Sequence, residues 1–216
     1  MDQKLLFLIN REWTHPVLDR VMALLSSFDA WFWPMIVFVV WILMRGNFRA
    51  RAFVLVAGLV VGLNDGLVSK SLKRAVDRPR PHQAMNDVRK VDLEKKTKPR
   101  LLAVFKPVKE GFSRISLEDV DGRSFPSSHT INMISVALVA VCFYGWRAWW
   151  TFLTAGLVGY SRIYTGSHWP SDVVTSIFLG LGCAMLWLAA IEWAWRRWGA
   201  RLAPGMHSAH PVLYAA

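Results

Sequence analysis

VVTSIFLGLGCAMLWLAAIEWAW, residues 173 to 195, is the stretch of sequence that decides the fold. Glu192 is its one charged residue, and the remainder is almost entirely apolar. A helix needs roughly 20 apolar residues to cross the hydrocarbon core of a bilayer. The stretch is therefore long enough to form a transmembrane helix.

Other apolar stretches lie upstream of this one. They cover Ala30 to Met44, Ala52 to Ser69, Thr130 to Tyr144 and Trp149 to Tyr164. Several are short, which favours tight helix packing or a locally thin bilayer. The chain is 54% hydrophobic and holds 12 Trp, a composition typical of a membrane protein rather than a soluble domain. We expect an all-α, polytopic membrane helix bundle with about five transmembrane helices and a long extramembrane loop.

The N-terminal part offers a further helix. Pro16 to Phe28 reads as an amphipathic segment with Asp19 and Arg20 on one side, so we expect it to lie in the membrane interface. A sixth span remains the alternative. Leu5 to Ile9 is too short for the core of a cleavable signal. The expected organisation is an interfacial segment at 1–28, a membrane domain at 29–200 with an extramembrane loop at 82–124, and a tail at 201–216.

The formal net charge is +11, which in a soluble protein could indicate nucleic-acid binding. The apolar content argues against a nucleic-acid partner, because membrane proteins place basic residues at the ends of their spans. In a five-span arrangement the basic loops share one side, which the positive-inside rule makes cytoplasmic. These loops contain Arg45, Arg49, Arg51, Arg147, Arg196, Arg197 and Arg201. The long segment from Arg74 to Ser128 is also basic, but long segments count for less in this rule.

Gly58, Gly62 and Gly66 form a small-xxx-small pattern, which predicts a face for close helix packing. Lys73 lies seven residues after Gly66, about 700° of helical rotation, so we expect it on the same inward face. Cys142 and Cys183 lie inside apolar runs and indicate neither a disulfide nor a zinc site.

Polar sequence gathers in clusters at the ends of the expected spans. The clusters are KRAVDRPRP at 73–81, FPSSHT at 125–130 and SRIYTGSHWPSD at 161–172. Each alone has a structural explanation: cations that reach the head groups, a helix cap, or a turn. The topology places all three at one membrane face. Together they offer cations, imidazoles and a helix N-terminus, which are the groups that bind phosphate.

The third cluster also holds chemistry. His168 and Asp172 are four residues apart, so one helical turn could bring the carboxylate under the imidazole and stabilise its charged form. Pro170 fits the first turn of that helix. With His129 available as well, one histidine could attack a phosphorus atom while the other donates a proton.

The spacing of the three clusters resembles the three-part signature of the type 2 phosphatidic acid phosphatase superfamily. That superfamily includes membrane lipid phosphatases, bacterial acid phosphatases and, more distantly, vanadium haloperoxidases. The matching residues are Lys73, Arg80 and Pro81, then Pro126 to His129, then Ser161, Arg162, His168 and Asp172. The motif usually has Gly where Ser128 stands, which restricts the backbone N–H geometry at that point.

The resemblance implies a role for each position. His168 would be the nucleophile that forms a phosphohistidine, Asp172 its orienting partner and His129 the general acid. The substrate phosphate would be held by Lys73, Arg80, Ser127, Ser128 and Arg162. Arg78 stays open between an anion contact and a surface charge, and Arg78→Ala is expected to keep much of the activity.

The resemblance also implies a function: an integral membrane phosphatase that hydrolyses a lipid phosphate or diphosphate without a metal or cofactor. The site would face the periplasmic side of the inner membrane. Undecaprenyl diphosphate is the favoured substrate, with phosphatidic acid, phosphatidylglycerol phosphate and phosphorylated lipid A as alternatives. A lipid phosphotransferase remains possible on the same residues. A non-catalytic lipid-phosphate binder is disfavoured because binding needs no nucleophile or acid. The expected partners are the phosphorylated lipid and the bilayer, and the oligomeric state stays open.

Overall fold

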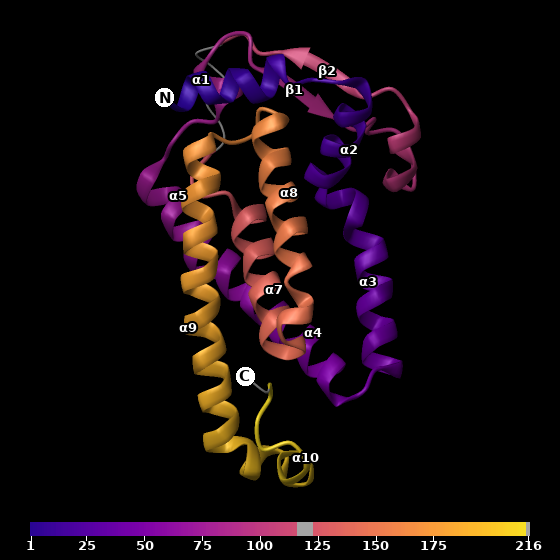
Figure 1. The fold of residues 1–216 in the computed structure, drawn as a ribbon, viewed down its shortest axis with the longest axis vertical. Helices are drawn as coiled ribbons and strands as arrows, with labels where there is room; N and C mark the ends of the chain where they lie inside the picture. Colours follow the sequence, from indigo (N-terminus) through magenta and orange to yellow (C-terminus); the bar gives the residue numbers. More distant parts are fainter. Residues whose placement is uncertain (116–122, 215–216) are drawn as a thin grey trace.

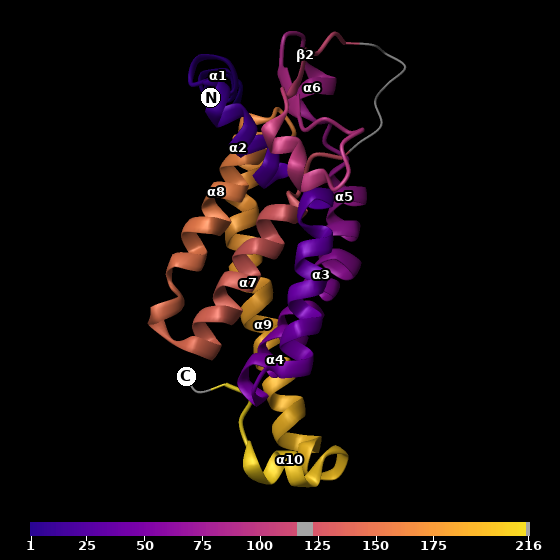
Figure 2. The same cartoon turned by 90° about the vertical axis from the view of Figure 1, so that its right-hand side faces the viewer.

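The computed structural model describes residues 1–115 and 123–214 of the chain. Within them, a helix forms over each of the apolar stretches (Figures 1 and 2). These are α3 (Phe28–Arg45), α4 (Phe48–Leu63), α7 (Ser128–Tyr144), α8 (Trp150–Tyr164) and α9 (Pro170–Leu202). α4 continues through the π-helical segment η2 (Asn64–Ser69) into α5 (Lys70–Val76). The expected all-α membrane bundle is confirmed.

The helices differ in their ability to cross a bilayer. In the described part of the chain, Phe28–Arg45, Phe48–Val76 and Pro170–Leu202 are long and apolar enough to do so. α7 has 17 residues and α8 has 15. At 1.5 Å per residue they measure about 26 and 22 Å, less than a hydrocarbon core of about 30 Å. α7 is a shorter apolar helix, and the expected number of about five spans stays a prediction.

α7 lies in the middle of the bundle and packs against α4, α8 and α9. Its Val139 and Phe143 form a buried apolar cluster with Val60 of α4 and Leu188 of α9. Gly180 of α9 allows the close approach, because a Cβ there would lie 2.8 Å from the carbonyl oxygen of Ile131. The α7–α9 contact therefore depends on backbone-to-backbone packing.

The prediction that the three glycines of α4 and η2 form a close helix-packing face is wrong for packing within the chain. Gly58, Gly62 and Gly66 are exposed, and a Cβ at any of them would meet no atom within 4 Å. Lys73 is half-buried as expected, but it does not continue the glycine face. The reason is η2, whose wider π-helical turn rotates α5 relative to α4.

The N-terminal residues form α1 (Asp2–Phe7), the π-helical η1 (Leu8–Glu12) and α2 (Pro16–Ser26). α1 lies at the end of the bundle where α8 ends and α9 begins, and α2 packs against α8. Arg20 is exposed, but Asp19 is buried, contrary to the expected polar side. Asp19 tolerates burial because Arg89 donates to its Oδ2 at 2.5 Å and Tyr164 donates to its Oδ1.

The loop before α7 is more ordered than its sequence predicts. It contains α6 (Pro81–Ala84), β1 (Arg89–Asp92), the 3-10 helix η3 (Arg100–Phe105) and β2 (Lys109–Phe112). β1 and β2 pair antiparallel, with Arg89 opposite Phe112 and Asp92 opposite Lys109. Val91, Leu93 and Ala103 pack on Ala23 of α2, which anchors this layer on the bundle. The short η4 (Trp146–Ala148) precedes α8, and α10 (Pro204–Ala209) follows α9.

Candidate active site

The polar clusters meet at one end of the bundle. The end of α5, the start of α7 and the turn between α8 and α9 all face the end that carries β1 and β2 (Figure 1). The α3–α4 connection and the end of α9 lie at the opposite end. The arginine-rich connections are thus separated from the candidate site by the length of the apolar helices.

The second cluster forms the start of α7. Ser127 is buried directly before the helix, and its N–H donates to Ser176 Oγ at 2.9 Å. Its hydroxyl oxygen accepts a hydrogen bond of 3.0 Å from Thr130. Ser128 and His129 follow as the first helical residues and are half-buried. The helix start expected from the sequence is present.

A tight turn after α8 brings His168 back beside Arg162. The carbonyl oxygen of Arg162 accepts the N–H of Ser167 at 3.0 Å and the N–H of His168 at 3.1 Å. Gly166 sits in this turn at φ +70, in the left-handed region that favours glycine. α9 then begins at Pro170, as the sequence predicts. Arg162 and His168 are both buried.

Asp172 lies close to His168, but it is held mainly by other groups. The distance from His168 Nδ1 to Asp172 Oδ2 is 3.9 Å, too long for a hydrogen bond. Asp172 is fully buried, and its Oδ2 accepts from the Trp169 N–H at 3.1 Å and from the Ser124 hydroxyl. The ring nitrogen nearest the carboxylate is Nδ1, which leaves Nε2 for a reacting group.

Arg78 has a role that the sequence did not suggest. Its Nη1 donates to Asp172 Oδ1 at 2.6 Å, and its Nη2 donates to Asp2 Oδ2 at 2.7 Å. Its guanidinium also lies 5.1 Å from the centre of the Trp169 ring. Arg78 is therefore not a free surface charge, and it holds the carboxylate beside His168.

The remaining cations surround the two histidines. Lys73, Arg80 and Arg162 lie within electrostatic range of His129. In the described residues, Arg80 Nε, Arg162 Nε and His129 Nε2 are buried without a hydrogen-bond partner. Buried polar groups are normally satisfied, so this convergence is typical of a site that takes up a polar ligand. The cations make an anion the matching ligand.

Comparison with known proteins identifies the family. The sequence pattern of the PAP2 superfamily matches residues 49–197, well over half of the chain. The chain belongs to the PAP2 superfamily. The resemblance seen in the sequence is thereby confirmed.

Several individual proteins are similar to this chain. The lipid A 4'-phosphatase of Porphyromonas gingivalis is 28% identical over 97% of this chain and 80% of its own length. The undecaprenyl-diphosphatase BcrC of Bacillus subtilis is 24% identical over 76% of this chain and 70% of its own length. Two other relatives align over only 30% and 45% of their lengths. The crystal structure of Aquifex aeolicus LpxE superimposes with a TM-score of 0.54 at 25% identity, covering 87% of this chain and 94% of that one.

The charges around the candidate site change the pKa of His168, which lies in the turn outside the apolar helices. Burial, followed by the charges of Arg162 and Arg80, holds the pKa of His168 well below its ordinary 6.5. Burial lowers the pKa of Arg80 as well, although an arginine remains charged at neutral pH. His168 is therefore a neutral imidazole at pH 7, the form that a nucleophile requires.

Sequence reasoning missed the residues that fix this PAP2 site from the N-terminal segment. Arg162 Nη1 donates to the carbonyl oxygen of Ser26 at 2.8 Å and to the Ser26 hydroxyl. Asn10 is buried, and its Nδ2 donates to the carbonyl oxygens of Tyr164 at 2.6 Å and Arg89 at 2.7 Å. One feature of the sequence could have indicated this role of the N-terminal segment: the polar Asn10 directly follows the apolar run from Leu5 to Ile9.

Metal ligands are not gathered in the described part of this PAP2 protein. No group of three or more His, Cys, Asp or Glu side chains there could hold a metal ion. Cys142 and Cys183 are both free.

Proposed function

We propose that this protein is an integral membrane phosphatase that hydrolyses a lipid phosphate or diphosphate through a phosphohistidine at His168. The observation that supports it best is buried His168 together with half-buried His129 inside a group of cations that includes Arg80 and Arg162. A protein that only bound phosphate would need the cations but neither imidazole. The relatives named as phosphatases agree with this choice.

The first step transfers the phosphoryl group to the enzyme. His168 Nε2 attacks phosphorus, the N–P bond forms, and the bond from phosphorus to the lipid oxygen breaks. His129 gives its proton to the departing oxygen. Asp172, 3.9 Å from Nδ1, stabilises the positive charge that develops on the ring.

The second step releases phosphate. A water molecule attacks phosphorus, His129 accepts its proton, and the N–P bond breaks to restore neutral His168. Lys73, Arg80 and Arg162 stabilise the phosphoryl oxygens in both steps. Preorganised donors of this kind each contribute about 3 kcal/mol to the transition state.

The start of α7 adds donors to the phosphate site. The Ser127 hydroxyl accepts a hydrogen bond from Thr130 and keeps its own hydrogen for a phosphate oxygen. Ser128 and the first-turn N–H groups of α7 provide the positive end of the helix dipole. The cations supply the charge neutralisation that Mg²⁺ provides elsewhere, so the proposed reaction uses no metal or cofactor.

The substrate is a membrane lipid, and undecaprenyl diphosphate and phosphorylated lipid A are its leading candidates. The first is supported by the Bacillus relative and the second by the Porphyromonas relative. A site at the end of the apolar helices suits a lipid that presents its phosphate at head-group depth. Since the arginine-rich connections lie at the other end, the site faces the periplasmic side of the inner membrane.

The test is phosphate release by the purified protein in detergent, with EDTA present, across undecaprenyl diphosphate, phosphatidic acid and phosphorylated lipid A. We expect release from at least one lipid, unchanged by EDTA and lost in His168→Ala. No release from any lipid would contradict the proposed activity, and activity that disappears with EDTA would contradict the metal-free reaction. Phosphate recovered on an added acceptor lipid would indicate a phosphotransferase instead.

A further inference from the structure

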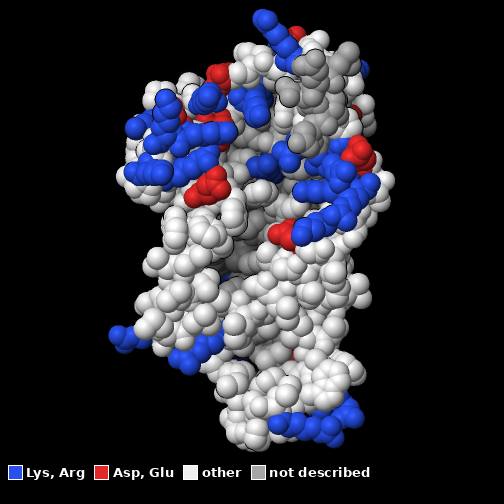
Figure 3. Space-filling model, turned by 180° about the vertical axis from the view of Figure 1, so that it is seen from behind, with Lys and Arg blue, Asp and Glu red and all other residues white. Residues whose placement is uncertain are grey.

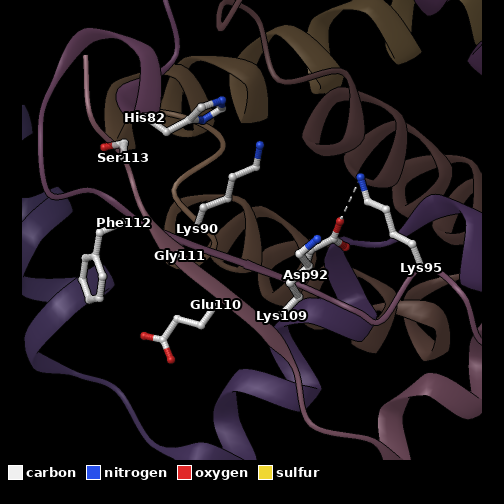
Figure 4. Close-up of a pocket in the computed structure, with 9 residues that line it drawn as sticks. All are labelled: His82, Lys90, Asp92, Lys95, Lys109, Glu110, Gly111, Phe112 and Ser113. Atoms are coloured by element: carbon white, nitrogen blue, oxygen red, sulfur yellow. Dashed lines mark ion pairs between the residues drawn. The ribbon is translucent and has the colours of Figure 1, made fainter. Parts of the chain in front are cut away.

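A charged pocket lies beside the candidate active site, on the loop layer formed by β1 and β2. Its volume is about 320 Å³. Figure 4 shows the residues that line it, and their ionisable members are His82, Lys90, Asp92, Lys95, Lys109 and Glu110. The reaction proposed above uses none of them.

The register of the two strands gives the pocket its positive face. Lys90 pairs with Gly111 and Asp92 with Lys109, so these four residues point to the same side of the sheet. Glu110 belongs to the opposite side, where it accepts a hydrogen bond from Arg89, and it points away from Lys90 in Figure 4. The space beside Gly111, opposite Lys90, is open, because a Cβ at Gly111 would meet nothing within 4 Å.

The one carboxylate on this side is already paired. Asp92 lies 3.8 Å from Lys95 Nζ and 3.4 Å from Arg100 Nη2. In the part of the chain that the structure describes, Lys90 and Lys109 make no ion pair within 4 Å. Among the described residues, Lys90 and Lys109 therefore have no carboxylate within 4 Å, and Glu94 acts on Lys109 only through longer-range electrostatics. Ammonium groups in this arrangement favour an anionic ligand.

The pocket is adjacent to the catalytic groups. His82 Nδ1 lies 3.1 Å from the carbonyl oxygen of Gly166. His168 follows Gly166 by two residues, a chain span of at most about 7 Å. Asp92 lies within electrostatic range of Arg162, and Arg80 within range of His82. A molecule bound at His168 could therefore reach the pocket with a neighbouring part of its head group.

We propose that this pocket binds a second anionic group of the substrate head group, distinct from the phosphate that is cleaved. This inference rests on the proposed lipid phosphatase activity. It makes the preferred substrate class a lipid whose head group carries another phosphate or acid, separated from the cleaved phosphate by a linker of about sugar size. A lipid with a single phosphate would occupy the catalytic site alone.

Lipid A with two phosphates and lipid A with one are matched probes, because they share tails and sugars. With the double variant Lys90→Gln/Lys109→Gln in neutral detergent, we expect the KM for the bisphosphorylated lipid to rise about tenfold while kcat stays unchanged. The KM for the monophosphorylated lipid should stay unchanged. Lys106→Gln is the control, since Lys106 is an exposed lysine of the same loop that does not line the pocket. It should behave as the wild type.

Binding gives a readout that does not depend on turnover. In a His168→Ala background, the bisphosphorylated lipid should bind about tenfold more weakly when Lys90 and Lys109 are also replaced. Equal binding, or equal losses with both lipids, would overturn the pocket assignment. Equal losses with both lipids would indicate that the lysines attract anionic lipid surfaces in general. Failure of the wild type to cleave any lipid would instead overturn the proposed activity, so the two failures are distinguishable.

Discussion

At the scale of single residues, Arg78 is the residue whose contacts in the structure differ most from the role expected from the sequence. Its motif spacing left it outside the phosphate-binding set, and the sequence suggested that its loss would matter little. In the structure it donates to buried Asp172 and to Asp2. A buried carboxylate that loses its cation is strongly disfavoured in its charged form. Arg78 is therefore a positioning residue that acts through Asp172.

For Arg78→Gln we expect kcat to fall by at least about tenfold with KM nearly unchanged, because the variant disturbs Asp172 rather than the phosphate ligands. Arg78→Lys should recover part of the loss. Steady-state kinetics with one lipid phosphate measures both parameters. A rise in KM at constant kcat would show that Arg78 binds substrate directly.

His168 predicts a pH dependence. Its pKa is lowered by burial and by Arg162 and Arg80, so the neutral, nucleophilic form persists as the pH falls through 6.5. The acidic decline of kcat/KM should therefore lie below pH 6.5. Arg80→Gln removes a positive charge that opposes protonation of His168. The pKa of His168, and with it the acidic decline of kcat/KM, should therefore move to higher pH. Profiles of kcat/KM from about pH 4 to 9 test this prediction. An acidic decline at the same pH in Arg80→Gln as in the wild type would contradict it.

The sequence could predict the motif residues because their types and spacing carry the chemistry. It could not predict the residues that hold them. Ser26 contacts Arg162 across 136 positions, and Asn10 contacts Tyr164 across 154 positions. Neither contact leaves a periodic signal in the sequence, since each depends on where whole helices pack.

At the scale of elements, the apolar stretches predicted the helices. The strands of the loop and the π-helical turn η2 were not predicted. β1 and β2 are short, and their charged residues show no clean alternation, so composition indicated a solvated loop. η2 needs long-range contacts: Asn64 donates to Ser135 Oγ at 2.9 Å and accepts from Trp187 at 3.1 Å. Those contacts explain why a helical wheel misplaced Lys73 relative to the glycines.

The α8–α9 turn carries a prediction about stability. Gly166 has φ +70, and a Cβ there would lie 2.6 Å from the carbonyl oxygen of Arg89. Gly166→Ala should therefore cost about 1–3 kcal/mol and lower the thermal unfolding midpoint in detergent. Gly156→Ala in α8 is the control, because a Cβ there meets nothing within 4 Å. Equal midpoints for the two variants would contradict the account of this turn.

At the scale of the whole molecule, charge divides the protein into two ends. Figure 3 shows Lys and Arg side chains gathered in the upper part, on both sides of a hollow, and again at the lower end. Between them lies a belt of mostly uncharged surface, as expected where apolar helices cross a bilayer. The candidate site and the pocket on β1 and β2 belong to the upper end.

This division predicts an orientation. In a protein whose Cys142 and Cys183 are replaced by Ala, Lys95→Cys should react with a membrane-impermeant maleimide in cells with a permeable outer envelope. Arg201→Cys, at the end of α9, should react only after the membrane is opened. Both positions are exposed, so access is limited by the membrane alone. The reverse pattern would place the site in the cytoplasm.

The central claim is that distant polar clusters assemble around His168 as the nucleophile. Its most direct test is capture of the phosphorylated enzyme. After brief mixing with a lipid carrying radioactive phosphate and an acid-free quench, we predict phosphate on the peptide containing His168. The label should be absent in His168→Ala. Phosphate that maps to another residue, or hydrolysis that continues in His168→Ala, would contradict the account.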